Sequence, residues 1–184
     1  MNIYCMRHGR THYNDLGLCN DDPCQHVHLT ESGIAQAESA ALALRGVAFV
    51  RILVSPLPRT RQTAEIVNRF HAVPIEVHPD LADIRSGFEG KPVADYFRAI
   101  SADPLQMRIN GGESVLDHKQ RIVRFIKWLA NQKDESVLIV AHEETMRVFV
   151  AYFEGGIEDS QLRDIHVGNC EYRHYALPRA ASPG

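Results

Sequence analysis

The chain has 184 residues, of which 45% are hydrophobic, and its formal net charge is −3. This length can bury one core, so we expect a single domain over residues 1–177 and a tail at 178–184. The slight negative charge, without any basic block, argues against nucleic-acid binding. No apolar run approaches the ~20 residues of a membrane helix and no signal peptide is recognisable, so we expect no membrane partner and a cytoplasmic location.

Predicted strands and helices alternate along the chain. Apolar runs predict strands at residues 2–6, 50–54, 73–77, 136–141, 165–167 and 171–177. Apolar residues at helical spacing predict helices at residues 30–44, 58–70, 113–132 and 144–153. Residues 80–106 are less regular, and we expect a short cap around 84–110. This alternation predicts an α/β fold: a three-layer α/β/α sandwich around a mostly parallel central sheet.

Three predicted strands end in residues that suit phosphate chemistry. Arg7, His8 and Gly9 follow the first strand, Arg59 lies in the turn after the second, and His142 follows the apolar strand at 136–141. Ligands of parallel sheets bind where the carboxyl ends of the strands open into a crevice. Two histidines and two arginines there would form a cage for a tetrahedral anion, with one imidazole free to attack it. Alternatively, His8 is only a hydrogen-bonded residue at a strand end.

The four cysteines do not indicate an exported, disulfide-bonded protein, so we expect reduced thiols. Cys19, Cys24, His26 and His28 lie close together in one polar segment and raise the question of a zinc site. Their C-x4-C-x-H-x-H spacing fits no common structural zinc pattern. We therefore predict a surface loop over a pocket, without a metal.

Several motifs, taken together and in order, resemble those of the histidine phosphatase superfamily, in its phosphoglycerate mutase-like branch. The matching segments are RHGRT at 7–11 with Asn14, LTESG at 29–33 with QA at 36–37, SPLPRTRQTA at 55–64, LAD at 81–83 with GFEG at 87–90, GES at 112–114, and VAH at 140–142 with Arg147. The matches cover nearly the whole chain and are specific in combination. The resemblance implies a phosphoglycerate mutase-like fold.

The resemblance also implies roles for the residues at the strand ends. His8 would attack phosphorus as a neutral imidazole and form a phosphohistidine, with no metal and no cofactor. Arg7, Arg59 and Asn14 would bind the phosphate oxygens. His142, expected to be charged near the dianion, would stabilise the transition state. Further candidates for substrate binding are Arg10, Thr11 and Glu143.

This chain departs from the family pattern at positions that bear on catalysis and specificity. Asp83 stands where the family has Glu; it would protonate the leaving alkoxide and later activate water, but it is also open to interpretation as a solvated loop carboxylate. Phe88 stands where Trp is usual. Glu143 and Glu144 follow the second histidine, where glycines are frequent. Glu143 either lies at the edge of the phosphate or only opens the next helix.

We therefore expect a metal-independent phosphomonoester hydrolase that acts on a small phosphorylated metabolite. The cap looks too short to exclude water as mutases of the family do, which favours hydrolysis over a phosphoglycerate-type mutase. A catalytically weak phosphate-binding protein and a metal-dependent hydrolase that uses some of the 10 histidines remain alternatives. The sequence decides neither the substrate nor the oligomeric state.

Overall fold

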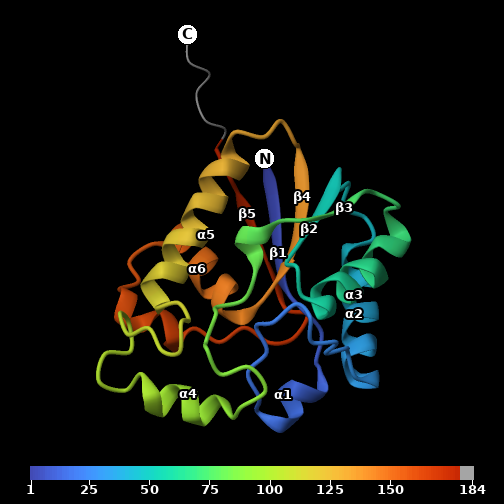
Figure 1. Cartoon of the computed structure of the whole chain (residues 1–184). Coiled ribbons are helices and arrows are strands. Elements are labelled where there is room, and N and C mark those ends of the chain that lie inside the picture. The colour runs from blue at the N-terminus through green and yellow to red at the C-terminus, as the bar shows by residue number, and fades with distance from the viewer. Residues whose placement is uncertain (179–184) are drawn as a thin grey trace.

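The computed structural model describes residues 1–178 and has a five-stranded sheet at its centre (Figure 1). The strands are β1 (Asn2–Arg7), β2 (Arg51–Val54), β3 (Ile75–Val77), β4 (Ser136–Ala141) and β5 (Tyr172–Ala176), in the order β3-β2-β4-β1-β5. The four strands from β3 to β1 are parallel, and β5 runs antiparallel to β1 at one edge. The expected mostly parallel sheet is confirmed, with β3 at the other edge, where Pro74 precedes it.

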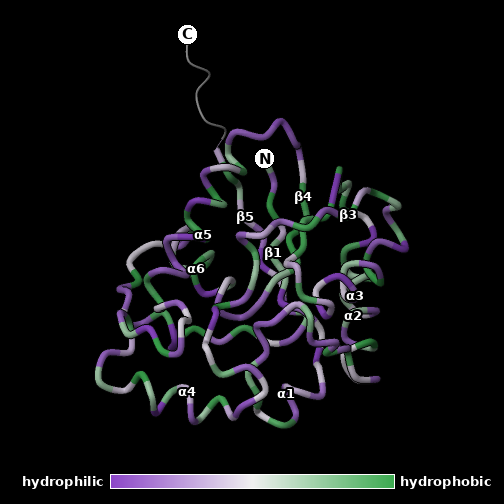
Figure 2. The backbone as a smooth tube through the Cα atoms, viewed as in Figure 1, coloured by the Kyte–Doolittle hydropathy of each residue, from purple (hydrophilic) through white to green (hydrophobic). Residues whose placement is uncertain are grey.

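Helices cover both faces of the sheet (Figure 1). The main helices are α2 (Glu31–Leu44), α3 (Pro58–Val67), α5 (Val115–Ala130) and α6 (Glu143–Glu154). β4 is buried along its whole length, and its residues alternate between the faces. Leu138 and Val140 pack with α2 and α3, whereas Val137 and Ile139 pack with α5 and α6. Figure 2 shows β4 as an apolar segment at the centre of the molecule. The α/β/α sandwich is confirmed.

Several short elements lie outside those predicted from the sequence. They are α1 (His12–Leu16), α4 (Val93–Ala99) and the 3-10 turns η2 (Pro79–Leu81) and η3 (Asp159–Asp164), whereas the 3-10 turn η1 (Asn68–Phe70) falls within the predicted helix at 58–70. α1 and α4 lie together beyond the ends of β1 and β4, at the bottom of Figure 1. Helices of five and seven residues contain too few turns for an apolar stripe to be recognised. This end of the molecule surrounds the site described below.

The strand predicted at 165–167 is wrong. The carbonyl of Ile165 accepts a hydrogen bond from Arg147 Nε at 2.9 Å, and that of Val167 accepts one from Arg7 Nη1 at 2.6 Å. The Val167 N–H donates to Glu143 at 3.3 Å. Side chains thus satisfy the backbone groups that a strand would pair with a neighbour.

Other boundaries differ by a few residues. The helix predicted at 58–70 ends at Val67 and continues as η1. The helix predicted from 113 begins at Val115, because the Ser114 side chain caps it by accepting a bond from the Asp117 N–H. The predicted tail lies, apart from Pro178, outside the described residues.

Candidate active site

The carboxyl ends of β1, β2 and β4 bring the expected residues together. His8 directly follows β1, Arg59 lies in the first turn of α3 after β2, and His142 is the N-cap of α6 after β4. All three are buried, and the ring centroids of His8 and His142 are 5.4 Å apart. The convergence follows from the sheet order, because β2, β4 and β1 are neighbours and run in one direction.

His8 is held as a neutral imidazole whose Nε2 is unprotonated. Its Nδ1 lies 2.7 Å from the Gly9 carbonyl, which can only accept, so we assign the ring proton to Nδ1. Nε2 then accepts a hydrogen bond from Arg59 Nε at 3.0 Å. Burial, followed by the charge of Arg59, lowers the pKa of His8 well below 6.5. The unprotonated nitrogen therefore faces the cationic side of the site.

Arg59 connects the other groups of the site. Its Nη2 lies 2.9 Å from Asp83 Oδ2 and 2.9 Å from His142 Nδ1. It also donates to the side-chain oxygen of Asn20 and, at 3.0 Å, to the Asn20 carbonyl. Arg61, two residues further along α3, is exposed and pairs with Glu65. Arg59 is buried and Arg61 exposed, so the two arginines lie on different faces of α3.

His142 is oriented by partners on both ring nitrogens. Nδ1 faces Arg59 Nη2 and lies 3.4 Å from Asp83 Oδ2, whereas Nε2 lies 2.7 Å from Ser55 Oγ. Burial, followed by the charges of Arg59 and His8, lowers the pKa of His142 well below 6.5. In the absence of a phosphoryl group, these surroundings therefore favour the neutral form of His142 over the charged form that we expected.

Asp83 lies within the same cluster as a titratable carboxyl group. Its Oδ1 accepts from the Ile84 N–H at 2.9 Å, and its side chain is 20% exposed. Burial raises its pKa to about 6; Arg59 acts in the opposite direction, and Glu144 and Asp21 add to the rise. A carboxyl group that titrates near neutral pH can exchange protons in both directions.

Arg121 of α5 anchors the segment that carries Asp83. Its guanidinium donates to three carbonyls of this segment, those of Asp80 at 2.7 Å, Ala82 at 2.9 Å and Asp83 at 3.2 Å. It pairs with the buried Glu113 at 2.6 Å. The sequence pattern indicates Glu113 only as the start of a helix and gives Arg121 no role. The available signal was position, since Arg121 precedes the inward-facing Phe125 by one helical turn.

Both alternatives that the sequence left open for Glu143, a helix start and a pocket residue, describe its position. It is the first residue of α6, and it also lines the pocket beside the phosphate-binding candidates. Its Oε2 lies 3.0 Å from Arg7 Nη1, and its Oε1 lies 3.3 Å from Arg147 Nη2. Arg7 also donates to the Val167 carbonyl. A carboxylate therefore already contacts one of the two pocket arginines.

The remaining candidates of the first motif separate into two groups. Thr11 and Asn14 line the pocket and cap α1 reciprocally, with Asn14 Oδ1 accepting from the Thr11 N–H at 3.0 Å. Arg10 is exposed, pairs with Asp15 and lies outside the residues that line the pocket. Gly9 allows close packing rather than ligand approach, because a Cβ there would lie 2.6 Å from the Gly33 carbonyl oxygen.

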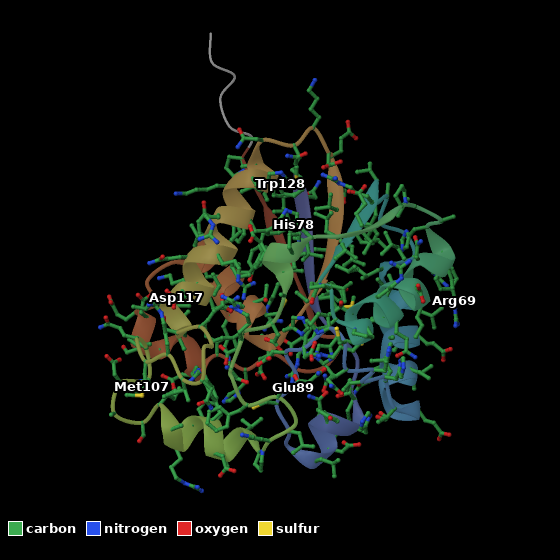
Figure 3. All side chains as sticks on the ribbon, in the orientation of Figure 1. Arg69, His78, Glu89, Met107, Asp117 and Trp128 are labelled. Atoms are coloured by element: carbon green, nitrogen blue, oxygen red, sulfur yellow. The ribbon has the colours of Figure 1, made fainter. Side chains whose placement is uncertain are left out.

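Asn20 and Glu89 are site residues to which the sequence assigned no role, although the motif GFEG at 87–90 includes Glu89. Glu89 accepts from Asn20 Nδ2 at 3.0 Å and from the Asp21 and Asp22 N–H groups at 2.6 and 2.9 Å. Glu89 thereby connects Asn20, which accepts hydrogen bonds from Arg59, to the cap. Figure 3 places Glu89 near the carboxyl ends of the strands. A buried asparagine in a polar loop gives no sequence pattern that would identify it.

The segment considered for zinc forms a loop beside the pocket. Cys19 is buried against the cap and lines the pocket, whereas Cys24 is exposed. The rings of His26 and His28 stack with centroids 6.2 Å apart. Within residues 1–178, no group of three or more His, Cys, Asp or Glu side chains could hold a metal ion. Nor is any helix in this range long and apolar enough to cross a membrane.

Comparisons with known proteins agree with the motifs. The model of the histidine phosphatase superfamily (branch 1) matches residues 3–179. An adenosylcobalamin/alpha-ribazole phosphatase from Salmonella typhimurium is 31% identical over 160 residues, which are 82% of this chain and 78% of the relative. The probable fructose-2,6-bisphosphatase TIGAR A from Danio rerio is 34% identical, over 94% of this chain and 73% of the relative.

Solved structures give the same result. The crystal structure of a putative alpha-ribazole-5'-P phosphatase from Escherichia coli has a TM-score of 0.85 and 27% identity, and the match covers 95% of this chain and 89% of that one. Both the family model and the relatives thus span most of the sequence. This chain belongs to the histidine phosphatase superfamily, branch 1, and is a phosphoric monoester hydrolase.

Proposed function

We propose that this chain hydrolyses small phosphate monoesters through a phosphohistidine at His8, without a metal ion. The observation that carries the proposal is the pair of contacts on the His8 ring. The Gly9 carbonyl fixes the proton on Nδ1, and Nε2 is left as the nucleophile, 3.0 Å from Arg59 Nε. Relatives named as phosphatases of small molecules support the substrate class.

In the first step, the His8 Nε2 lone pair forms a bond to phosphorus while the bond from phosphorus to the leaving oxygen breaks. Arg7 and Arg59 offset the charge of the equatorial oxygens, and the Arg59 Nε–H turns from His8 to one of them. Asn14 contributes its amide donors. Asp83 in its protonated form gives its proton to the leaving oxygen.

In the second step, water replaces the leaving alcohol. Asp83, now a carboxylate, takes a proton from the water while the water oxygen attacks phosphorus. The bond between phosphorus and Nε2 breaks, which releases inorganic phosphate and restores neutral His8. His142 Nδ1 accepts a hydrogen bond from Arg59 Nη2, and the ring proton on Nε2 faces Ser55 Oγ. Nδ1 can therefore donate to the phosphoryl group only if the dianion raises the pKa of His142.

The test is a panel of phosphate monoesters with released inorganic phosphate as the readout. We expect turnover that is unchanged in excess EDTA and absent in His8→Ala, which should keep its melting temperature because His8 adds little to the core. Loss of turnover in EDTA would favour a metal-dependent hydrolase. Binding of phosphate esters without turnover would favour a phosphate-binding protein.

A further inference from the structure

The ionisable side chains on the pocket wall are mostly acidic. In the part of the chain that the structure describes, the pocket lining contains no lysine, and its arginine and carboxyl side chains are Arg7, Arg59, Asp21, Asp83, Glu143 and Glu144. Both arginines belong to the phosphate end, next to His8. A dianionic phosphoryl group would therefore take up the positive charge of these two arginines. The carboxylates Asp21, Glu143 and Glu144 would remain on the wall.

Glu144 and Asp83, the proposed acid, line the same pocket. Arg163 contacts the Glu144 carboxylate at 3.3 Å and the Tyr96 hydroxyl at 3.0 Å, which places Glu144 next to α4. Glu144 Oε1 contacts Arg147 Nη1 at 2.9 Å and Arg163 Nε at 3.3 Å. Neither of these arginines lines the pocket. They hold Glu144 from behind and offer no contact to a bound ester.

The same side of the pocket carries aromatic rings. Tyr96 and Phe97 of α4 line it, together with Tyr13. The Arg163 guanidinium lies behind the two α4 rings, 5.3 Å from the Tyr96 centroid and 4.8 Å from the Phe97 centroid, and it donates to the Tyr96 hydroxyl at 3.0 Å. These contacts orient the two rings, and together with Glu144 they hold the Arg163 guanidinium in place.

We propose that this wall selects phosphate monoesters whose leaving alcohol is uncharged or cationic and has an apolar or aromatic face, and that Glu144 rejects anionic leaving groups. The inference rests on the proposed function, whose substrate class it narrows. A carboxylate or second phosphate on the alcohol would meet the Glu144 carboxylate without any cation of the described pocket lining to pair with. An ammonium group would meet that carboxylate favourably.

Three matched substrates test the charge preference: 4-methylphenyl, 4-carboxymethylphenyl and 4-aminomethylphenyl phosphate. The methylene group keeps the charge away from the phenol oxygen, so the intrinsic reactivities stay similar. We expect the wild-type kcat/KM for the anionic ester to be about tenfold lower than for the neutral ester, and that for the cationic ester to be equal or higher. Added salt should narrow the gap.

Two variants with the same charge change assign the effect to Glu144. Glu144→Gln should raise the anionic-to-neutral ratio of kcat/KM by about three- to tenfold and lower the cationic-to-neutral ratio. Glu65→Gln, which removes an exposed carboxylate on the far side of α3, should leave both ratios unchanged. Ratios between substrates also cancel any general loss of activity.

Binding of the same esters to His8→Ala, measured by calorimetry, tests the preference without turnover. Charge-ordered binding with no hydrolysis by the wild type would refute the proposed function and support the charge selection. Hydrolysis of the neutral and anionic esters at equal efficiency would refute the charge selection and leave the hydrolase intact. Equal ratios in wild type and Glu144→Gln would overturn the assignment to Glu144.

Discussion

The floor of the pocket and its cap are built in different ways. On the floor, His8, Arg59 and His142 follow strand ends and are buried, and Arg59 contacts both histidines directly. In the cap, α4 has no strand beneath it, and Phe97 is 43% exposed. Hydrogen bonds from distant side chains, chiefly those of Arg121 and Glu89, hold this side in place. The sheet thus fixes the residues that we propose for the phosphate chemistry, while side-chain anchors set the position of the proposed acid, Asp83, and of the proposed leaving-group wall.

Loss of a floor cation should have the largest effect among substitutions of arginine. Arg59→Ala should lower kcat by at least about a hundredfold, because it removes a preorganised donor from the phosphoryl group. Arg61→Ala, on the exposed face of α3, should keep activity within about twofold of wild type. Steady-state kinetics with 4-nitrophenyl phosphate measure both. Similar losses in the two variants would show that the turn after β2 does not direct Arg59 alone to the phosphate.

Loosening the cap anchor should have a smaller and substrate-dependent effect. Arg121→Lys keeps a cation beside Glu113 but cannot reach all three carbonyls of the Asp83 segment. We expect kcat for 2-phenylethyl phosphate, a poor leaving group that needs the acid, to fall by about tenfold. Turnover of 4-nitrophenyl phosphate, which needs little protonation, should change by less than about twofold.

Arg124→Lys, three residues further along α5 and exposed, is the matched control and should leave both activities unchanged. Equal losses for both substrates in Arg121→Lys would mean that Arg121 supports the fold in general and does not position Asp83. Far-UV circular dichroism separates that outcome from unfolding.

The pH profile should report Asp83 with an effect of several-fold. Its pKa is raised to about 6, so the protonated acid prevails below pH 6 and is lost above it. For 2-phenylethyl phosphate, kcat/KM should therefore fall as the pH rises from 6 to 8. The lowered pKa of His8 keeps the nucleophile unprotonated on the acidic side. Asp83→Asn should abolish the decline, and a profile that rises through this range would contradict the assignment.

The sequence predicted the floor well and the cap poorly, for physical reasons. An apolar run that ends in His8 or His142 fixes where the side chain lies, because parallel strands deliver their ends to one edge. The position of Arg59 follows from the same rule, because α3 begins just after the turn that follows β2 and Arg59 lies in its first helical turn.

The anchors of the cap depend on contacts between residues far apart in the chain. Arg121 and the Asp83 carbonyl are 38 residues apart, and Glu89 and the Asp21 N–H are 68 apart. No local period encodes such contacts. The wrong strand at 165–167 has the same origin, because Arg7 and Glu143 take the backbone groups that a ladder would use.

The protonation state of His142 could not be predicted from the sequence either. An imidazole beside a bound dianion is expected to be cationic, but burial next to Arg59 and His8 lowers its pKa, and neither burial nor these distances can be read from the motif.

Trapping the phosphoenzyme tests the central proposal most directly. Enzyme mixed with a 32P-labelled ester and quenched in alkali should carry label that is stable in base, labile in acid and located on the peptide containing His8. Wild type and Arg61→Ala should both show it, whereas His8→Ala should show none. Label on another residue, or turnover by His8→Ala equal to that of wild type, would contradict a phosphohistidine at His8.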